Sequence, residues 1–198
     1  MLTEADTSTR LVVPKLKEAG WENQPHAFRE QHSFTDGRII VTGQISRRRA
    51  KKRADFLLDY TRDVTIAVVE AKMESEPAGT GMQQAKDYAE ILGLKFAYAT
   101  NGHQIIEFDY LTGTEREIDA FPSPQELWDR FRSASSMEPK TVTSVLEPFN
   151  LQGGKTPRYY QQVAINRAVQ AIASGQDRVL LTMATGTGKT FVAFQICW

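Results

Sequence analysis

Three side chains in the first half of the chain, Asp55, Glu70 and Lys72, have types and spacing that could act together in a chemical reaction. Glu70 and Lys72 are separated by one residue at the end of the apolar run TIAVV, so on a strand they project from the same face. Asp55 lies in the preceding segment RADFLLDY, and a short polar turn at 61–63 predicts that the two segments form a hairpin. Adjacent carboxylates can bind Mg²⁺ through oxygen, and a lysine beside them can hold a phosphate or help deprotonate water.

The spacing of the acid and the lysine is weak evidence by itself, because Glu138 and Lys140 repeat it in a segment rich in Ser, Thr and Pro. The context separates the two pairs. Glu70 and Lys72 end a strongly apolar strand, where charged groups are costly unless they are solvated or used. We therefore interpret Asp55, Glu70 and Lys72 as a candidate metal-dependent site.

The elements that must position these residues follow from the apolar periodicity. A first helix is predicted after a Thr3 cap and ends at Gly20. A second, 79–93, has glycines at both ends, and a third, 123–131, begins at a serine cap. The predicted strands are 37–44, 53–60, 64–72, 95–101 and 104–110, the last two joined by an Asn-Gly turn.

A second unit follows a change in composition. Residues 135–157 are rich in Ser, Thr, Pro and Gly and predict a linker between a domain at 1–134 and a unit at 158–198. That unit reads as a helix (159–175), a strand (178–183), a glycine-rich loop and the first turns of another helix.

The segment MATGTGKT predicts a phosphate-binding loop, with backbone N–H groups at a helix start. In this pattern Lys189 reaches the β- and γ-phosphates and Thr190 reaches Mg²⁺, while Met183 stands where the usual first glycine would be. No later strand supplies an acidic Mg²⁺-binding motif, so we expect no ATP turnover from this chain alone. The expected nucleotide-binding residues of the loop are Gly186, Thr187, Gly188, Lys189 and Thr190.

A basic run directly precedes Asp55. Such a cluster can neutralise DNA phosphates beside a metal site, although it can equally be a solvated turn. No aromatic residues are interleaved with it, so base stacking is not indicated. The candidate DNA-binding residues are Arg47, Arg48, Arg49, Lys51, Lys52 and Arg53.

Several motifs in order resemble a known family. Asp55, the sequence Glu70-Ala71-Lys72, and the pair Gln84 and Tyr88 are similar to the PD-(D/E)xK nuclease motif and its Q-x-x-x-Y helix. This combination is typical of the R (restriction) subunits of type I restriction endonucleases, and the similarity extends to the phosphate loop. Ala54 replaces the proline of the motif, a position that tolerates variation.

The resemblance implies roles for individual residues. Asp55 and Glu70 would bind the metal, and Lys72 would be the catalytic lysine. Glu4 would be an accessory acid, although it also suits the positive end of its helix. Gln84 and Tyr88 lie one helical turn apart, so both would reach the site or the DNA backbone. Alternatively, Gln84 is a surface residue and Tyr88 packs in the core. In the segment PRYYQ, Gln161 resembles the adenine contact of superfamily 2 motors.

The expected fold is a mixed sheet flanked by helices, followed by the first strand, P-loop and helix of a RecA-like motor. The expected function is Mg²⁺-dependent cleavage of double-stranded DNA after ATP-driven translocation, in a complex with methyltransferase (M) and specificity (S) subunits. Two alternatives remain: a catalytically silent DNA-binding or docking module of the motor, and a nuclease-helicase of DNA repair or phage defence.

Composition excludes several other classes. The 198 residues contain one cysteine and three histidines, which leaves no disulfide framework and no plausible zinc cluster. No stretch has the apolar length of a membrane span, and the first residues lack a signal-peptide profile, so we expect a cytoplasmic protein. The formal net charge is zero, so only the local basic run suggests a polyanionic partner.

Overall fold

The centre of the molecule is a six-stranded sheet. The structure is a computed structural model, and it describes residues 2–35, 39–42, 45–48, 51–135, 137–151 and 156–198. Strands β5 and β6 pair in parallel and the other neighbours pair antiparallel, so the predicted mixed sheet is confirmed. The strand order is β1-β4-β5-β6-β7-β8. The bounds are β1 Ala27–Phe34, β4 Lys52–Thr61, β5 Val64–Ala71, β6 Phe96–Thr100, β7 Ile105–Asp109 and β8 Thr114–Ile118.

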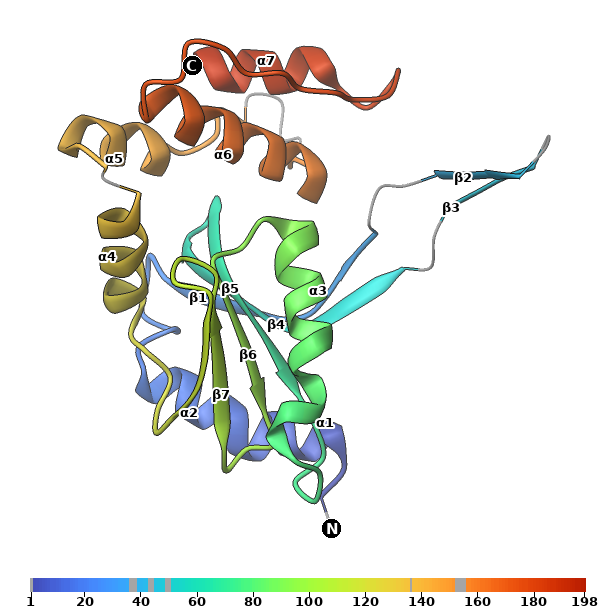
Figure 1. Cartoon of the computed structure of the whole chain (residues 1–198), viewed down its shortest axis with the longest axis vertical. Helices are drawn as coiled ribbons and strands as arrows, with labels where there is room; N and C mark the ends of the chain where they lie inside the picture. Colours follow the sequence, from blue (N-terminus) through green and yellow to red (C-terminus); the bar gives the residue numbers. More distant parts are fainter. Residues whose placement is uncertain (1, 36–38, 43–44, 49–50, 136, 152–155) are drawn as a thin grey trace.

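Helices cover both faces of this sheet (Figure 1). The predicted first helix is divided into α1 (Glu4–Thr7), a π-helical turn η1 (Ser8–Val12) and α2 (Val13–Glu18). Thr3 caps it as predicted, and the π-helical turn lies just before Pro14, which has no amide hydrogen for a regular helical bond. Helix α4 (Pro124–Ala134) packs in the same core cluster as α2.

Helix α3 (Met82–Leu92) covers the opposite face, after a 3₁₀ turn η2 (Ala78–Gly81). Leu57 of β4 and Val68 of β5 pack against α3, whereas Phe56 and Val69 pack in the cluster that contains α2 and α4. Because side chains alternate along a strand, residues 55 and 70 fall on the α3 side of the sheet.

A separate two-stranded hairpin projects from the body of the molecule (Figure 1). Its strands are β2 (Ile39–Thr42) and β3 (Ile45–Arg48), which pair antiparallel. Strand β2 lies within the predicted strand at 37–44, but β1, β3 and β8 were not predicted from the sequence. The hairpin connects β1 to β4, so its base adjoins the segment that contains Asp55.

The second unit differs from its prediction in one element. Helices α6 (Tyr159–Ala173) and α7 (Lys189–Cys197) form as expected, and α5 (Pro139–Leu146) lies within the predicted linker. The predicted strand at 178–183 is wrong: the segment has no regular secondary structure, and Leu180 is 91% exposed. A strand needs a neighbouring strand to receive its backbone hydrogen bonds, and no described strand pairs with this apolar segment. Among the described residues, no helix has the length and apolarity to cross a membrane.

Candidate nuclease site and phosphate loop

The structure brings Asp55 and Glu70 into direct contact. Phe56 of β4 lies opposite Val69 of β5, so the register places the two acids side by side. The Asp55 backbone N–H donates to Glu70 Oε1 at 3.3 Å, and the Ala71 N–H donates to Asp55 Oδ2 at 2.9 Å. Both carboxylates are buried, with 7% of Asp55 and 1% of Glu70 exposed.

Helix α3 supplies the residues that connect this pair to the lysine. Gln84 Nε2 donates to Glu70 Oε2 at 2.8 Å and to the Tyr88 hydroxyl at 3.1 Å. Lys72 Nζ donates to Gln84 Oε1 at 3.2 Å, so a single amide holds three of the predicted residues. Gly81 at the start of α3 leaves room for them, since a Cβ there would lie 3.3 Å from Lys72 Cε.

Glu4 is not joined to the pair in the same way. It is exposed in the first turn of α1, beside the Thr3 cap. The described residues contain no group of three or more Asp, Glu, His or Cys side chains arranged to hold a metal ion. In this structure Asp55 and Glu70 therefore form a two-carboxylate site that Glu4 does not complete.

The chemistry of the Asp55–Glu70 pair fits a divalent cation. Within the described part of the chain, no salt bridge reaches either carboxylate. Burial raises the pKa of Glu70 to about 8, and the neighbouring Asp55 carboxylate adds to the rise, with a smaller addition from Glu4. Two neighbouring buried carboxylates repel each other when both are ionised, and an oxygen-binding cation such as Mg²⁺ offsets that repulsion.

This raised pKa predicts a pH-dependent stability of the metal-free protein. Between the ordinary value of 4.5 and about 8, Glu70 keeps a proton in the folded state that it loses on unfolding. The free energy of unfolding should therefore fall as pH rises through this range, by at most about 1.4 kcal/mol per pH unit. Urea titrations from pH 5 to 8 with a chelator present should show a shallower pH dependence for Glu70→Gln. Parallel curves for the two proteins would contradict the assignment.

Gln31 is a site residue that the sequence did not reveal. It lies on β1 between the paired residues Glu30 and His32, directly across from Asp55, but is not itself paired. Its Nε2 donates to Asp55 Oδ1 at 3.1 Å. Among the described residues it is the only one other than glycine with positive φ, at 52°, a conformation that costs a non-glycine residue about 1–2 kcal/mol. Strand β1 had no clear sequence signal, so its contribution could not be foreseen.

The segment predicted to be a phosphate-binding loop directly precedes α7. Gly186 and Gly188 have positive φ, and Gly188 is the N-cap of α7, so Lys189 and Thr190 occupy the first turn of that helix. Lys189 Nζ donates to the Met183 carbonyl at 3.1 Å.

Gln161 of α6 contacts this loop directly. Its Nε2 donates to the Thr187 carbonyl at 2.8 Å, and a Cβ at Gly188 would lie only 2.4 Å from the same nitrogen. The loop therefore needs glycine at this position both for its φ and for the close approach of Gln161.

The basic run lies at the junction of the projecting hairpin and β4. Arg47 and Arg48 end β3, and Arg49 lies outside the described residues. Lys51 and Arg53 are exposed, while the Lys52 ammonium lies 5.3 Å from the centre of the Tyr88 ring. The basic segment thus adjoins the candidate nuclease site.

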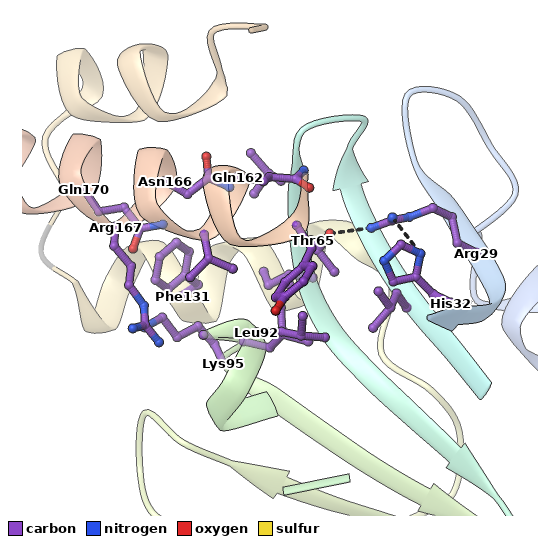
Figure 2. A pocket seen from close by; sticks show the side chains of 17 residues that line it. Arg29, His32, Thr65, Leu92, Lys95, Phe131, Gln162, Asn166, Arg167 and Gln170 are labelled. Carbon is purple, nitrogen blue, oxygen red and sulfur yellow. Dashed lines mark hydrogen bonds between the residues drawn. The ribbon is translucent and has the colours of Figure 1, made fainter. Parts of the chain in front are cut away.

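A pocket of about 50 Å³ lies elsewhere, where α6 meets the sheet (Figure 2). Arg29 and His32 line one side, and Lys95 and Arg167 approach each other on the other side (Figure 2). Neither of the paired carboxylates lines it, so it is not part of the candidate nuclease site.

The contacts around this pocket join α6 to the sheet domain. Gln162 Nε2 and Asn166 Nδ2 both donate to the carbonyl of Asp63, at 3.0 and 2.9 Å. Arg167 also reaches the Glu90 carbonyl of α3, at 3.5 Å. The pocket is therefore a gap within a hydrogen-bonded junction.

Comparisons with known proteins agree with the motif order. Residues 24–122 match the family model described as the type I restriction enzyme R protein N terminus (HSDR_N), and residues 154–198 match the model described as type III restriction enzyme, res subunit. The chain is 42% identical over 205 residues to the type I restriction enzyme EcoAI endonuclease subunit of Escherichia coli, covering 100% of this chain and 25% of that protein.

Two further relatives have related names. The EcoKI endonuclease subunit of Escherichia coli (strain K12) is 56% identical over 153 residues, covering 71% of this chain and 12% of that protein. A solved fragment of a putative HsdR subunit of a type I restriction enzyme from Vibrio vulnificus YJ016 matches with a TM-score of 0.89 and 58% identity, covering 100% of this chain and 38% of that one. The chain therefore spans well under half the length of these relatives.

Proposed function

Since this chain belongs to the type I restriction enzyme R protein family, we propose that residues 1–134 are a Mg²⁺-dependent endonuclease domain that cleaves double-stranded DNA. The observation that carries this proposal is the placement of two buried acidic residues, Asp55 and Glu70, side by side on β4 and β5, with the Gln84 amide joining Glu70 to Lys72. Neighbouring acids and a basic group beside them are the parts that phosphodiester hydrolysis needs.

Each side chain has a distinct part in the proposed reaction. Asp55 and Glu70 would hold the cation, which when bound supplies an activated water and neutralises charge on the phosphate. The Lys72 ammonium would stabilise the negative charge that develops on the phosphate oxygens. Gln84 would orient both residues, because its amide donates a hydrogen bond to Glu70 and accepts one from Lys72.

The second unit would couple this domain to a motor. We propose that the loop at 186–190, with Gln161, binds ATP in the full-length protein, and that translocation precedes cleavage. We further propose that the full-length protein assembles with M and S subunits, which supply sequence recognition. The match of residues 154–198 to the model described as type III restriction enzyme, res subunit, supports the assignment of this second unit.

Metal binding tests the proposal against a catalytically silent docking module. Titration of Mn²⁺ into the metal-free chain should show a binding event that Asp55→Asn removes, because the substitution takes one of two anionic ligands away. Isothermal calorimetry measures this directly. Glu138→Gln is the matched control, since Glu138 is exposed and has the same spacing to a lysine. A wild-type chain that binds no Mn²⁺ would favour the silent module.

The basic run predicts a salt-dependent contribution to DNA binding. Replacing exposed Lys51 and Arg53 by alanine should weaken binding of duplexes of any sequence, because both would neutralise phosphates. The slope of log K against log salt should become shallower by about 0.9 for each phosphate that is no longer neutralised. Fluorescence anisotropy at several NaCl concentrations measures this slope, with Lys17→Ala as a control distant in sequence. An unchanged slope would assign the run to a solvated turn.

A further inference from the structure

We propose that Gln31 is a positioning residue that fixes the Asp55 carboxylate in the orientation used to bind the cation. This role rests on the proposed nuclease function. It extends the site to β1, an element outside the hairpin and helix that contain the other residues.

The hydrogen bonds of Asp55 show what Gln31 adds. Asp55 Oδ2 is held by the Ala71 N–H at 2.9 Å, and Oδ1 is held by Gln31 Nε2 at 3.1 Å. With one donor on each oxygen, the carboxylate cannot rotate about its Cβ–Cγ bond without losing a hydrogen bond. Each oxygen keeps a second lone pair, so a cation can bind while both donors stay in place. Residues that orient metal ligands in this way commonly change metal affinity when they are replaced.

The backbone conformation of Gln31 indicates that this residue serves the site and not the packing of the core. Its φ of 52° interrupts the pairing of β1 with β4 at the position across from Asp55. Glycine adopts this conformation without strain, yet the chain has a glutamine there. The side chain is not needed to fill the core, because the residue is exposed on an edge strand. What it contributes is its amide on Asp55, and strained residues that persist beside a reactive group are typical of functional sites.

Two substitutions separate the amide from the backbone. Gln31→Met keeps the length of the side chain and the strained φ but removes the donor. Gln31→Gly removes the donor and relieves the strain. The control is Gln83→Met, because Gln83 also donates its amide to an aspartate, Asp87 at 2.8 Å, but on the exposed surface of α3.

Titration of Mn²⁺ into the metal-free chain, with thermal unfolding measured in parallel, tests this role. Both Gln31 variants should bind Mn²⁺ roughly tenfold more weakly than wild type. The unfolding midpoint should be unchanged for Gln31→Met and unchanged or higher for Gln31→Gly, and Gln83→Met should match wild type in binding. In the complete enzyme, the Mg²⁺ concentration for half-maximal cleavage should rise by a similar factor.

The outcomes distinguish this role from the function on which it rests. If Gln31→Met binds Mn²⁺ as tightly as wild type while Asp55→Asn does not bind it, the positioning role is overturned and the metal site stands. If wild type itself binds no Mn²⁺, the proposed metal-dependent function fails and the role of Gln31 falls with it. Gln31→Met leaves a non-glycine residue at the same strained φ and removes only the amide donor. Its Mn²⁺ affinity therefore tests the positioning role even if the glycine variant folds differently.

Discussion

Replacing Lys72 by methionine in the complete enzyme is expected to reduce DNA cleavage by about three orders of magnitude, the scale of losing one charge-stabilising donor. Methionine keeps most of the apolar stem of lysine but cannot stabilise negative charge on the phosphate. DNA-stimulated ATP hydrolysis should continue, because Lys72 lies on the nuclease side and contacts Gln84 of α3. Asp55→Asn should have a comparable effect on cleavage. Conversion of covalently closed plasmid to linear DNA, measured beside phosphate release, separates the two activities.

The matched control for this experiment is Lys17→Met, since Lys17 is half-exposed and pairs with Glu22 on the surface. Its cleavage rate should equal that of wild type. Cleavage that survives in both Lys72→Met and Asp55→Asn would mean that the carboxylates and the lysine are not the catalytic centre. Loss of ATP hydrolysis together with cleavage would indicate instead that the substitution disrupts the fold or the assembly.

Replacing Arg130 by methionine is expected to destabilise the domain by about 3–5 kcal/mol, because the buried carboxylates of Glu107 and Asp109 both lose the guanidinium that they share. Glu107 is fully buried on β7 and receives both terminal nitrogens of Arg130 at 2.9 Å. Tyr98 also donates to it at 2.7 Å, and Arg116 donates at 3.0 Å. Burial alone would raise the pKa of Glu107. The hydrogen bonds from Arg130 and Tyr98 outweigh this effect and lower the pKa of Glu107 below its ordinary value.

Urea unfolding at neutral pH measures this effect. The expected loss is a large part of the total stability of an ordinary domain, about 5–15 kcal/mol. The double variant Glu107→Leu with Arg130→Met should recover only part of the loss, because it removes the Glu107 carboxylate but leaves Asp109 without Arg130 and the Tyr98 hydroxyl without its acceptor. A loss below about 1 kcal/mol for Arg130→Met alone, the size typical of surface pairs, would show that the carboxylate is not held as described.

The central site could be predicted because its signals are local. A short turn between two apolar segments sets the hairpin register, and that register alone brings Asp55 beside Glu70. The spacing of Gln84 and Tyr88 on one helix face then accounts for their shared hydrogen bond. The resemblance to nuclease motifs supplied the roles, but the proximity of these side chains follows from strand and helix periodicity.

The elements that were missed depend on contacts distant in sequence. The segment of β1, AFREQHSF, is largely polar, and only its pairing with β4 makes it a strand, so Gln31 could not be assigned to the site. The opposite error occurred at 178–183, where an apolar run predicted a strand that has no described neighbour to pair with. Helix α5 lies in a segment whose Ser, Thr and Pro content favoured a linker.

The position of Tyr159 has a consequence for dividing the chain into fragments. Its ring lies 6.2 Å from that of Phe34, which packs edge-on against Tyr88 at 5.0 Å, and its hydroxyl donates to the carbonyl of Thr35. A fragment cut after residue 134 would uncover the buried Phe34 ring and leave the Asp63 carbonyl without two amide donors from α6. The shortest piece that preserves the surroundings of Tyr88 therefore extends through α6, beyond the boundary that composition alone suggests.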